Sequence, residues 1–195
     1  MAANFERAMR FLQSGTYQPG TMEVRHWDYY DSAILATGTN NYQFFMVPEG
    51  QGGKNRSRTN FPLAGQMPES ERMAVMYLEF AFIPDEVMAQ ATWIHFTDIL
   101  KHSYIEFTIQ NKSPMLILPL HSCFGAALPA LVTGAAAGDQ LIPRDGIRAC
   151  YELDIEIPLA AKTTFKIEWV FDTTPNTALD DYKMYIHMVG PRYSF

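Results

Sequence analysis

Residues 147–157, IRACYELDIEI, alternate apolar and polar side chains along their whole length, and this stretch decides the fold class. The apolar positions are Ile147, Ala149, Tyr151, Leu153, Ile155 and Ile157. The positions between them are mostly charged, from Arg148 to Glu156. A period of two predicts a β-strand with one face on a core and the other in solvent.

Other segments extend this pattern along the chain. Residues 163–171 alternate in the same way, with Phe165 and Trp169 on the apolar face. Residues 72–83, RMAVMYLEFAFI, are apolar on nearly both faces, which predicts an inner strand or one covered on both sides. Further expected strands cover residues 104–110, 114–120 and 181–189, with weaker candidates at 22–30, 33–37 and 42–47. The sequence therefore predicts an all-β chain, an antiparallel sandwich or barrel of about eight strands.

Two short helices are expected in addition to the strands. Residues 4–13, NFERAMRFLQ, place Phe5, Ala8, Met9 and Leu12 on one face after a capping Asn4. This helix would pack on its own domain, on a neighbouring subunit or on a membrane surface. Pro84 followed by acidic residues is a helix-start signal, and it predicts a second helix at about 85–91. We expect residues 1–20 to form an N-terminal arm and residues 21–195 to form one β domain.

The composition indicates a protein whose surface is largely covered by partners. Hydrophobic residues make up 48% of the 195 residues and charged residues 18%, against about 25% charged in a typical domain. Aromatic residues reach 13% and there are 11 Met, as in the cores of large interfaces. A net charge of −6 argues against nucleic acid as the main partner. No secretory pattern or run long enough for a membrane span is present, which predicts a soluble protein made in a cytoplasm.

The sequence contains no recognisable catalytic or metal-binding motif. The five histidines include no H-E-x-x-H or H-x-H pair, and C-x-x-C and G-x-S-x-G are absent. We therefore expect no catalytic residue, no metal and no cofactor, and a chain that is not an enzyme. Cys123 and Cys150 are expected to be two buried thiols, although the sequence leaves open whether they pair.

Two long loops are candidates for contact with partners. The loop at 48–60 is rich in glycine and carries Lys54, Arg56 and Arg58, which would contact an anionic partner or simply be solvated. The loop at 125–146 is rich in small and apolar residues, whereas an exposed loop is normally polar. This composition predicts packing against a partner or its own domain. The expected interface residues of this loop and of the N-terminal helix are Leu128, Leu131, Val132, Phe5, Met9 and Leu12.

Three stretches together support a family resemblance. These stretches are TNFPLAGQMPESERMAVMYLEFAFIP (59–84), SYIEFTIQNKSPMLILPLHSCFG (103–125) and YELDIEIPLAAKTTFKIEWVF (151–171), and the chain ends with YIHMVGPRYSF (185–195). Their order of strands and turns resembles the single jelly-roll capsid proteins of tailless icosahedral bacteriophages. The resemblance implies two apposed four-stranded sheets and self-assembly of many copies into an icosahedral shell, which would place the protein in the virion. It leaves open a second capsid protein and an underlying membrane, for which the sequence gives no support.

Two other classes of protein remain alternatives. A non-catalytic ligand-binding sandwich, such as a carbohydrate-binding or receptor-binding virion module, would present exposed aromatic rings from Trp27, Tyr29, Tyr30 or Trp93. An enzyme of the cupin type would need a bound transition metal.

Overall fold

A computed structural model describes residues 23–83, 90–110, 112–124, 147–172 and 174–194. These residues form eight strands: β1 (Glu23–Ile34), β2 (Asn41–Phe44), β3 (Glu71–Ile83), β4 (Ser103–Ile109), β5 (Leu116–Pro119), β6 (Ile147–Leu159), β7 (Phe165–Phe171) and β8 (Lys183–Ser194). They also form the helices α2 (Gln90–Lys101) and α3 (Leu120–Phe124) and a single 3-10 turn, Thr177–Leu179.

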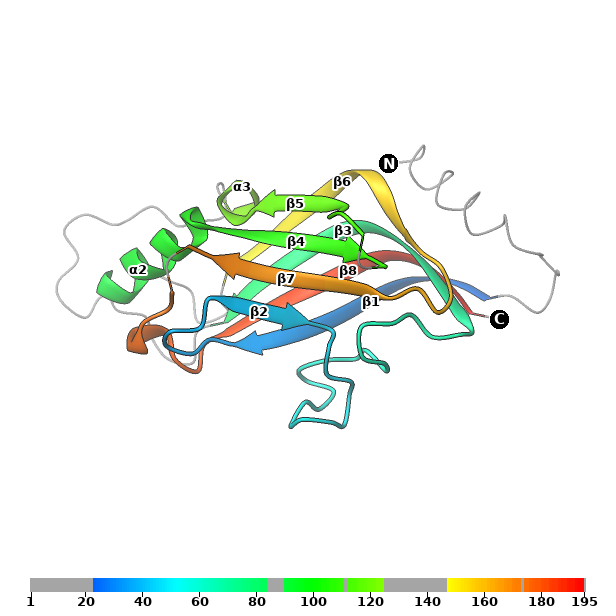
Figure 1. Cartoon of the computed structure of the whole chain (residues 1–195), viewed down its shortest axis with the longest axis horizontal. Helices are drawn as coiled ribbons and strands as arrows, with labels where there is room; N and C mark the ends of the chain where they lie inside the picture. Colours follow the sequence, from blue (N-terminus) through cyan, green and yellow to red (C-terminus); the bar gives the residue numbers. More distant parts are fainter. Residues whose placement is uncertain (1–22, 84–89, 111, 125–146, 173, 195) are drawn as a thin grey trace.

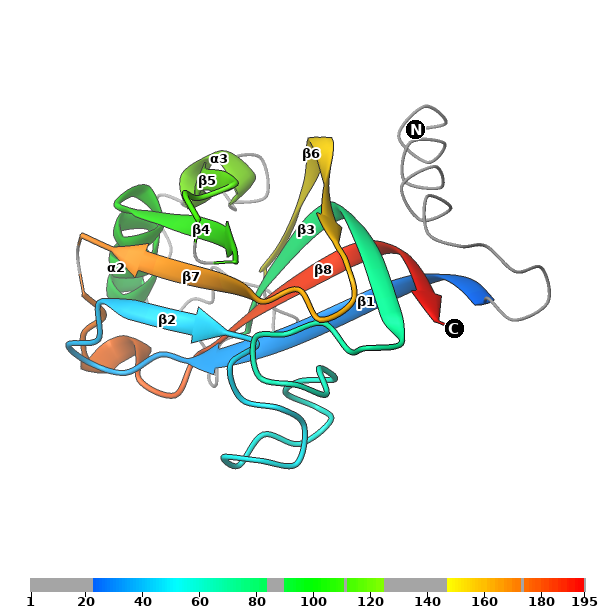
Figure 2. The ribbon, with the colours of Figure 1, turned by 45° about the vertical axis from the view of Figure 1, so that its right-hand side comes forward.

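The strands pack as two four-stranded antiparallel sheets (Figures 1 and 2). One sheet has the order β1-β8-β3-β6 and the other β2-β7-β4-β5, so strands distant in the sequence lie side by side. Two apposed sheets connected in this order form a jelly roll. The predicted all-β antiparallel sandwich of about eight strands is confirmed, and the predicted inner strand at 72–83 is β3, between β8 and β6.

Two of the weaker strand predictions are wrong, because they describe one strand as two. Residues 22–30 and 33–37 were expected as two strands, but Glu23–Ile34 is one continuous strand that pairs with β8 throughout. Asp31 and Ser32 break the apolar pattern in this strand, yet both are fully buried. A polar residue inside a strand ends its hydrophobic signal without ending the strand, because a partner elsewhere in the fold satisfies it.

A bulge distorts the centre of the β1-β8-β3-β6 sheet. The pairing of β3 with β8 shifts between Met73 and Tyr77, and its pairing with β6 shifts between Val75 and Tyr77. Gly190 of β8 lies against this bulge, where a Cβ atom would be 1.9 Å from the carbonyl oxygen of Ala74. Only glycine fits this position, because the obstacle is backbone of the neighbouring strand.

The same bulge corrects one prediction about the core. Glu152 pairs with Tyr77 and Ile157 with Val75, so the four β6 residues between them face the single residue Met76. The alternation of β6 is interrupted there, and Ile155 is 72% exposed instead of facing the core as predicted. The mismatch lies in the partner strand and cannot be read from β6 alone.

Aromatic side chains fill much of the space between the sheets. Tyr29, Phe45, Phe61 and Phe165 are buried and pack with their ring centroids 5.0–5.8 Å apart, mostly edge to face. Such edge-to-face contacts are favourable because the positive ring edge meets the negative ring face.

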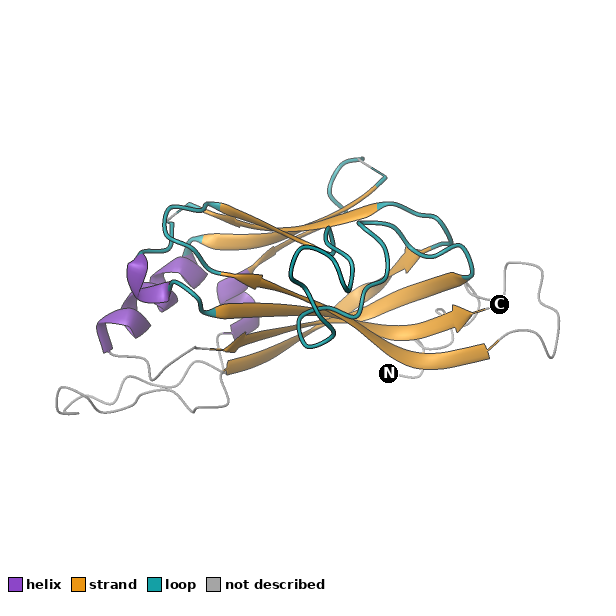
Figure 3. Ribbon diagram, turned by 90° about the horizontal axis from the view of Figure 1, so that it is seen from below, coloured by secondary structure: helices purple, strands orange, loops and turns teal. Residues whose placement is uncertain are grey.

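The helices cover one end of the sandwich (Figure 3). Helix α2 buries Trp93, Phe96 and Leu100, and Phe96 stacks on Phe82 of β3 with a centroid distance of 3.7 Å. The expected helix at 85–91 was placed too early, since α2 continues to Lys101 and residues 85–89 lie outside the described residues. The expected strand at 114–120 was too long, because Leu120–Phe124 form α3 and bury Leu120 and Phe124. Among the described helices, none is both long and apolar enough to cross a bilayer.

Candidate functional site

A buried ion pair anchors the loop between β2 and β3 to strand β1. The Asp31 carboxylate is 0% exposed and accepts hydrogen bonds from Lys54 Nζ at 2.6 and 2.7 Å. It also accepts a hydrogen bond from the backbone N–H of Phe45 at 2.6 Å. Phe45 has a φ of 63°, a left-handed conformation that a non-glycine residue adopts at a cost. Asp31 therefore holds both the entry of the loop and its middle in place.

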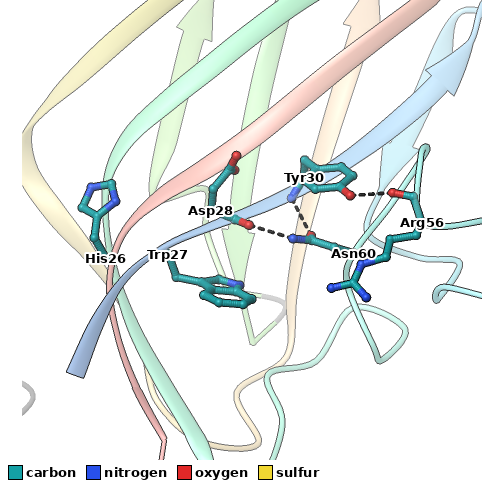
Figure 4. A pocket seen from close by; sticks show the side chains of 6 residues that line it. All are labelled: His26, Trp27, Asp28, Tyr30, Arg56 and Asn60. Carbon is teal, nitrogen blue, oxygen red and sulfur yellow. Dashed lines mark hydrogen bonds between the residues drawn. The ribbon is translucent and has the colours of Figure 1, made fainter. Parts of the chain in front are cut away.

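A second set of contacts, made by Asn60, ties this loop to the free edge of β1 (Figure 4). The Asn60 side chain accepts from the backbone N–H of Tyr30 at 2.9 Å and donates to the Asp28 carbonyl at 2.8 Å. Asn60 thereby acts as a short substitute for another strand, because it satisfies edge groups that a sheet normally leaves unpaired.

Two adjoining hollows flank Tyr30 where the loop meets the sheet, and together we call them the β1 hollow. The first, of about 310 Å³, is lined by His26, Trp27, Asp28, Tyr30, Arg56 and Asn60 (Figure 4). The second, of about 320 Å³, shares Asp28 and Tyr30 and adds chiefly Ala81, Ile83, Arg148, Tyr185 and His187. Strand register explains this grouping, because Tyr30 lies opposite His187 and Ala81 lies opposite both Tyr185 and Arg148.

Hydrogen bonds inside the β1 hollow hold its tyrosines and its histidine in place. Tyr30 donates its hydroxyl to the Arg56 carbonyl, and Tyr185 donates to the Ser57 carbonyl at 3.2 Å. His187 Nδ1 lies 2.9 Å from the Asp28 carboxylate. Burial raises the pKa of Tyr30, so its phenol stays protonated and donating at neutral pH.

The predicted anion contacts are placed in three different ways. The Lys54 ammonium is bound to Asp31 and only 11% exposed, so it is occupied within the fold. Arg58 Nε lies 3.4 Å from Ser32 Oγ, and Arg56 lines the β1 hollow. Contact of Arg56 and Arg58 with an anion stays a prediction.

Only two of the four aromatic residues named for a ligand-binding surface, Trp27 and Tyr30, line a common hollow. Tyr29 and Trp93 are buried in the core, which corrects their expected exposure. The guanidinium of Arg192 covers the ring of Trp27 at 3.7 Å from the ring centroid. Trp27 and Tyr30 both line the β1 hollow.

Tyr29 belongs instead to a buried polar network on the inner face of β1. It donates its hydroxyl to Glu71, and Arg192 Nη1 lies 3.2 Å from both the Glu71 carboxylate and the Tyr29 hydroxyl. Burial, followed by the hydrogen bond to Glu71, raises the pKa of Tyr29 far above its ordinary value. The network therefore contains a neutral phenol beside an ion pair at neutral pH.

Exposed apolar side chains concentrate at one border of the sandwich. Strand β1 contacts β2 across one border, which leaves β6 and β5 as the sheet edges at the opposite border (Figures 1 and 2). Ile155 of β6 is 72% exposed, Ile117 of β5 is 59% exposed and Met115, just before β5, is 57% exposed. These are the three most exposed large hydrophobic side chains among the described residues.

The two cysteines are unpaired and differ in their surroundings. Cys123 in α3 is half-buried, and burial raises the pKa of its thiol to about 12. Cys150 is exposed on β6, which corrects the prediction that both thiols are buried. Partial burial, with Glu79 and Glu152 nearby, also raises the pKa of the Cys150 thiol.

Within the described residues, no group of three or more His, Cys, Asp or Glu side chains is arranged to hold a metal ion. The six predicted interface residues, from Phe5 to Leu12 and from Leu128 to Val132, lie outside the described residues, as does the predicted 1–20 arm. The chain matches no protein-family model, and no curated protein is significantly similar to it in sequence.

Sequence reasoning missed most of the residues that form the β1 hollow and its anchor. Asp28, Arg148, Tyr185 and His187 come from three strands, and only the sheet order brings them together. The one available signal was that Arg148, Tyr185 and His187 occupy polar positions of alternating strands, which share an outer face.

Proposed function

We propose that the protein is a structural subunit of a bacteriophage virion that assembles in many copies into an icosahedral shell. The observation that carries this proposal is the concentration of exposed apolar side chains on the β5 and β6 edges of a single jelly roll. The jelly roll alone supports it only weakly, because the same fold also serves lectins and enzymes.

The β5 and β6 edges have the properties of a surface that is covered in an assembly. Natural proteins normally protect an edge strand with charge, bulges or a covering element, because its unpaired backbone groups invite pairing with another chain. Strand β6 carries exposed charges of this kind at Arg148, Glu152 and Asp154, but Ile155 beside them and Ile117 of β5 are also exposed. Contact between the edges of neighbouring subunits would remove both side chains from water and pair the free backbone groups.

The composition agrees with this arrangement. A low charged fraction of 18% and an aromatic fraction of 13% fit a chain with large buried interfaces, since interface cores are depleted in charge and enriched in aromatic residues. On this proposal the partners are further copies of the chain, with or without a second capsid protein.

Charged substitutions at the two edges are expected to block assembly. Ile117→Lys and Ile155→Lys would place an unpaired charge in each subunit contact and lower the yield of assembled particles by at least about tenfold, because burying an unpaired charge costs several kcal/mol. The fold of the subunit should be unaffected, since both side chains are mostly exposed. Sedimentation velocity measures the particle yield, and circular dichroism checks the fold.

Ile94→Lys is the matched control, because Ile94 is 51% exposed but lies on α2 rather than on an edge strand. It should assemble as well as the wild type. Normal assembly of both edge variants, or an equal defect in the Ile94 variant, would contradict the assignment of the interface to the edges.

A further inference from the structure

Some polar groups of the β1 hollow already have hydrogen-bond partners within the protein, and others do not. The Asp28 carboxylate is held by His187, and the hydroxyls of Tyr30 and Tyr185 donate to carbonyls of the β2–β3 loop. By contrast, the guanidinium groups of Arg56 and Arg148 form no hydrogen bond or ion pair with another described residue, and both residues are exposed. The unused hydrogen-bonding capacity is therefore mainly that of cationic donors.

Two acidic residues near the β1 hollow lie beside His187: Asp28 pairs with it directly, and Glu79 lies opposite it on β3. A third, Glu49, lies close enough to Tyr30 to help raise the pKa of its phenol. Arg148 lies in the next cross-strand row, beside Ala81 and Tyr185. A ligand carboxylate would thus approach Arg148 without displacing an existing ion pair.

The β1 hollow also offers a row of flat rings. The ring centroids of Tyr30 and His187 are 5.6 Å apart, and those of His187 and Tyr185 are 6.5 Å apart. Ala81 and Ile83 add apolar surface to the same wall. Rings and small apolar groups beside a few fixed polar groups are the usual lining of a site for a small organic ligand.

We propose that the β1 hollow binds an acidic saccharide, a sugar ring that carries a carboxylate. The flat rings would contact the C–H face of the sugar, and a guanidinium would hold the carboxylate through two parallel hydrogen bonds. Volumes of about 310 and 320 Å³ lie at the small end of ligand pockets and suit one or two sugar rings. A polyanion such as single-stranded nucleic acid fits less well, because the two arginines of the β1 hollow, on a chain of net charge −6, would neutralise few backbone phosphates.

This binding function is separate from assembly. The β1 hollow extends from β1 across the outer face of its sheet to Arg148 at the start of β6, whereas Ile155 lies seven residues further along β6 and Ile117 lies on β5 of the other sheet. A subunit that fails to assemble would still bind the saccharide, and a shell-forming subunit without this activity would still assemble.

The test compares cellobiouronic acid with neutral cellobiose, a disaccharide pair that differs in one carboxylate, by ligand-observed NMR titration of the full chain. We expect saturable binding of the acid in roughly the millimolar range and at least about tenfold weaker binding of cellobiose, since the carboxylate adds charge-assisted hydrogen bonds. Equal affinity for both sugars, or no saturable binding of the acid, would overturn the proposal.

Three variants locate the binding site. Arg148→Gln should weaken binding of the acid about tenfold and leave cellobiose unchanged, whereas Tyr185→Ala should weaken binding of both. Tyr185→Phe keeps the ring and should bind as the wild type does. Lys112→Gln removes an exposed cation near the turn after β4 and serves as the charge control, with no expected change. Wild-type affinity in Arg148→Gln, or tighter, salt-dependent binding of a single-stranded oligonucleotide at the same site, would reject the saccharide.

Discussion

Gly190→Ala is expected to lower the free energy of unfolding by about 3 kcal/mol or more, because an added methyl group cannot be accommodated without moving a neighbouring strand. The new Cβ atom would lie 1.9 Å from the Ala74 carbonyl oxygen and 3.2 Å from the Met76 backbone nitrogen. Both atoms belong to the bulge of β3, the strand that joins β8 to β6. The jelly roll would have to shift its central strand pairing to relieve the contact. Urea unfolding followed by tryptophan fluorescence measures the change.

Gly50→Ala is the control for this substitution. Gly50 has a φ of 83°, but no atom lies within 4 Å of the place that an added methyl group would take. Alanine there is therefore expected to cost only about 1 kcal/mol from backbone strain. Equal destabilisation by the two substitutions would show that the close contact at Gly190 does not determine its role.

Asp31→Ala is expected to lower the free energy of unfolding by about 3–5 kcal/mol, the usual cost of removing one partner of a buried ion pair. The substitution would leave the nearly buried Lys54 ammonium without its counter-charge and the Phe45 N–H without its acceptor. Phe45 would also lose the contact that holds its left-handed backbone. Thermal and urea unfolding at matched protein concentration measure the loss.

A second substitution separates the contribution of the ion pair to stability from that of the hydrogen bond to the Phe45 N–H. Adding Lys54→Met to Asp31→Ala should restore part of the stability, because the uncompensated charge is removed while the Phe45 N–H stays unsatisfied. Glu69→Ala breaks the exposed pair of Glu69 with Lys162 and should cost less than about 1 kcal/mol. A loss in Asp31→Ala as small as that in Glu69→Ala would contradict the anchoring role.

The sequence predicts the fold best where a strand pairs with its neighbours in one constant register along its whole length. Strand β7 alternates almost throughout: Phe165, Ile167, Trp169 and Phe171 are buried, and Val170 is the one apolar residue on its other face. Strand β6 follows the prediction up to Leu153 and departs from it at Ile155, because the mismatch in pairing belongs to β3. A periodic pattern in one strand carries no information about the register of its neighbour.

The helix boundary was wrong for a different reason. Trp93, Phe96 and Leu100 have the spacing of one helical face and are all buried, so the signal for α2 was present in the sequence. The start signals at Pro84 and Asp85 predict a helix that begins and ends too early, because they say nothing of the apolar residues that extend α2 to Lys101. A helical period in a mostly β chain is easily overlooked because short apolar runs fit either structure.

The candidate sites depended on contacts that only the three-dimensional structure provides. The sequence shows Lys54 as a cation on a glycine-rich loop, but its partner Asp31 is distant in the sequence and lies inside a strand whose apolar pattern is broken. The exposed border was equally hidden, because Ile117 and Ile155 are ordinary strand residues until the order of the sheets places both at an edge.

The native mass of the wild-type protein, measured by light scattering and sedimentation at several protein and salt concentrations, tests the proposed shell function most directly. The account predicts closed particles of many copies that form without any added cofactor, with assembly favoured at higher protein concentration. A monomer that stays stable and dispersed at high concentration under all of these conditions would contradict it.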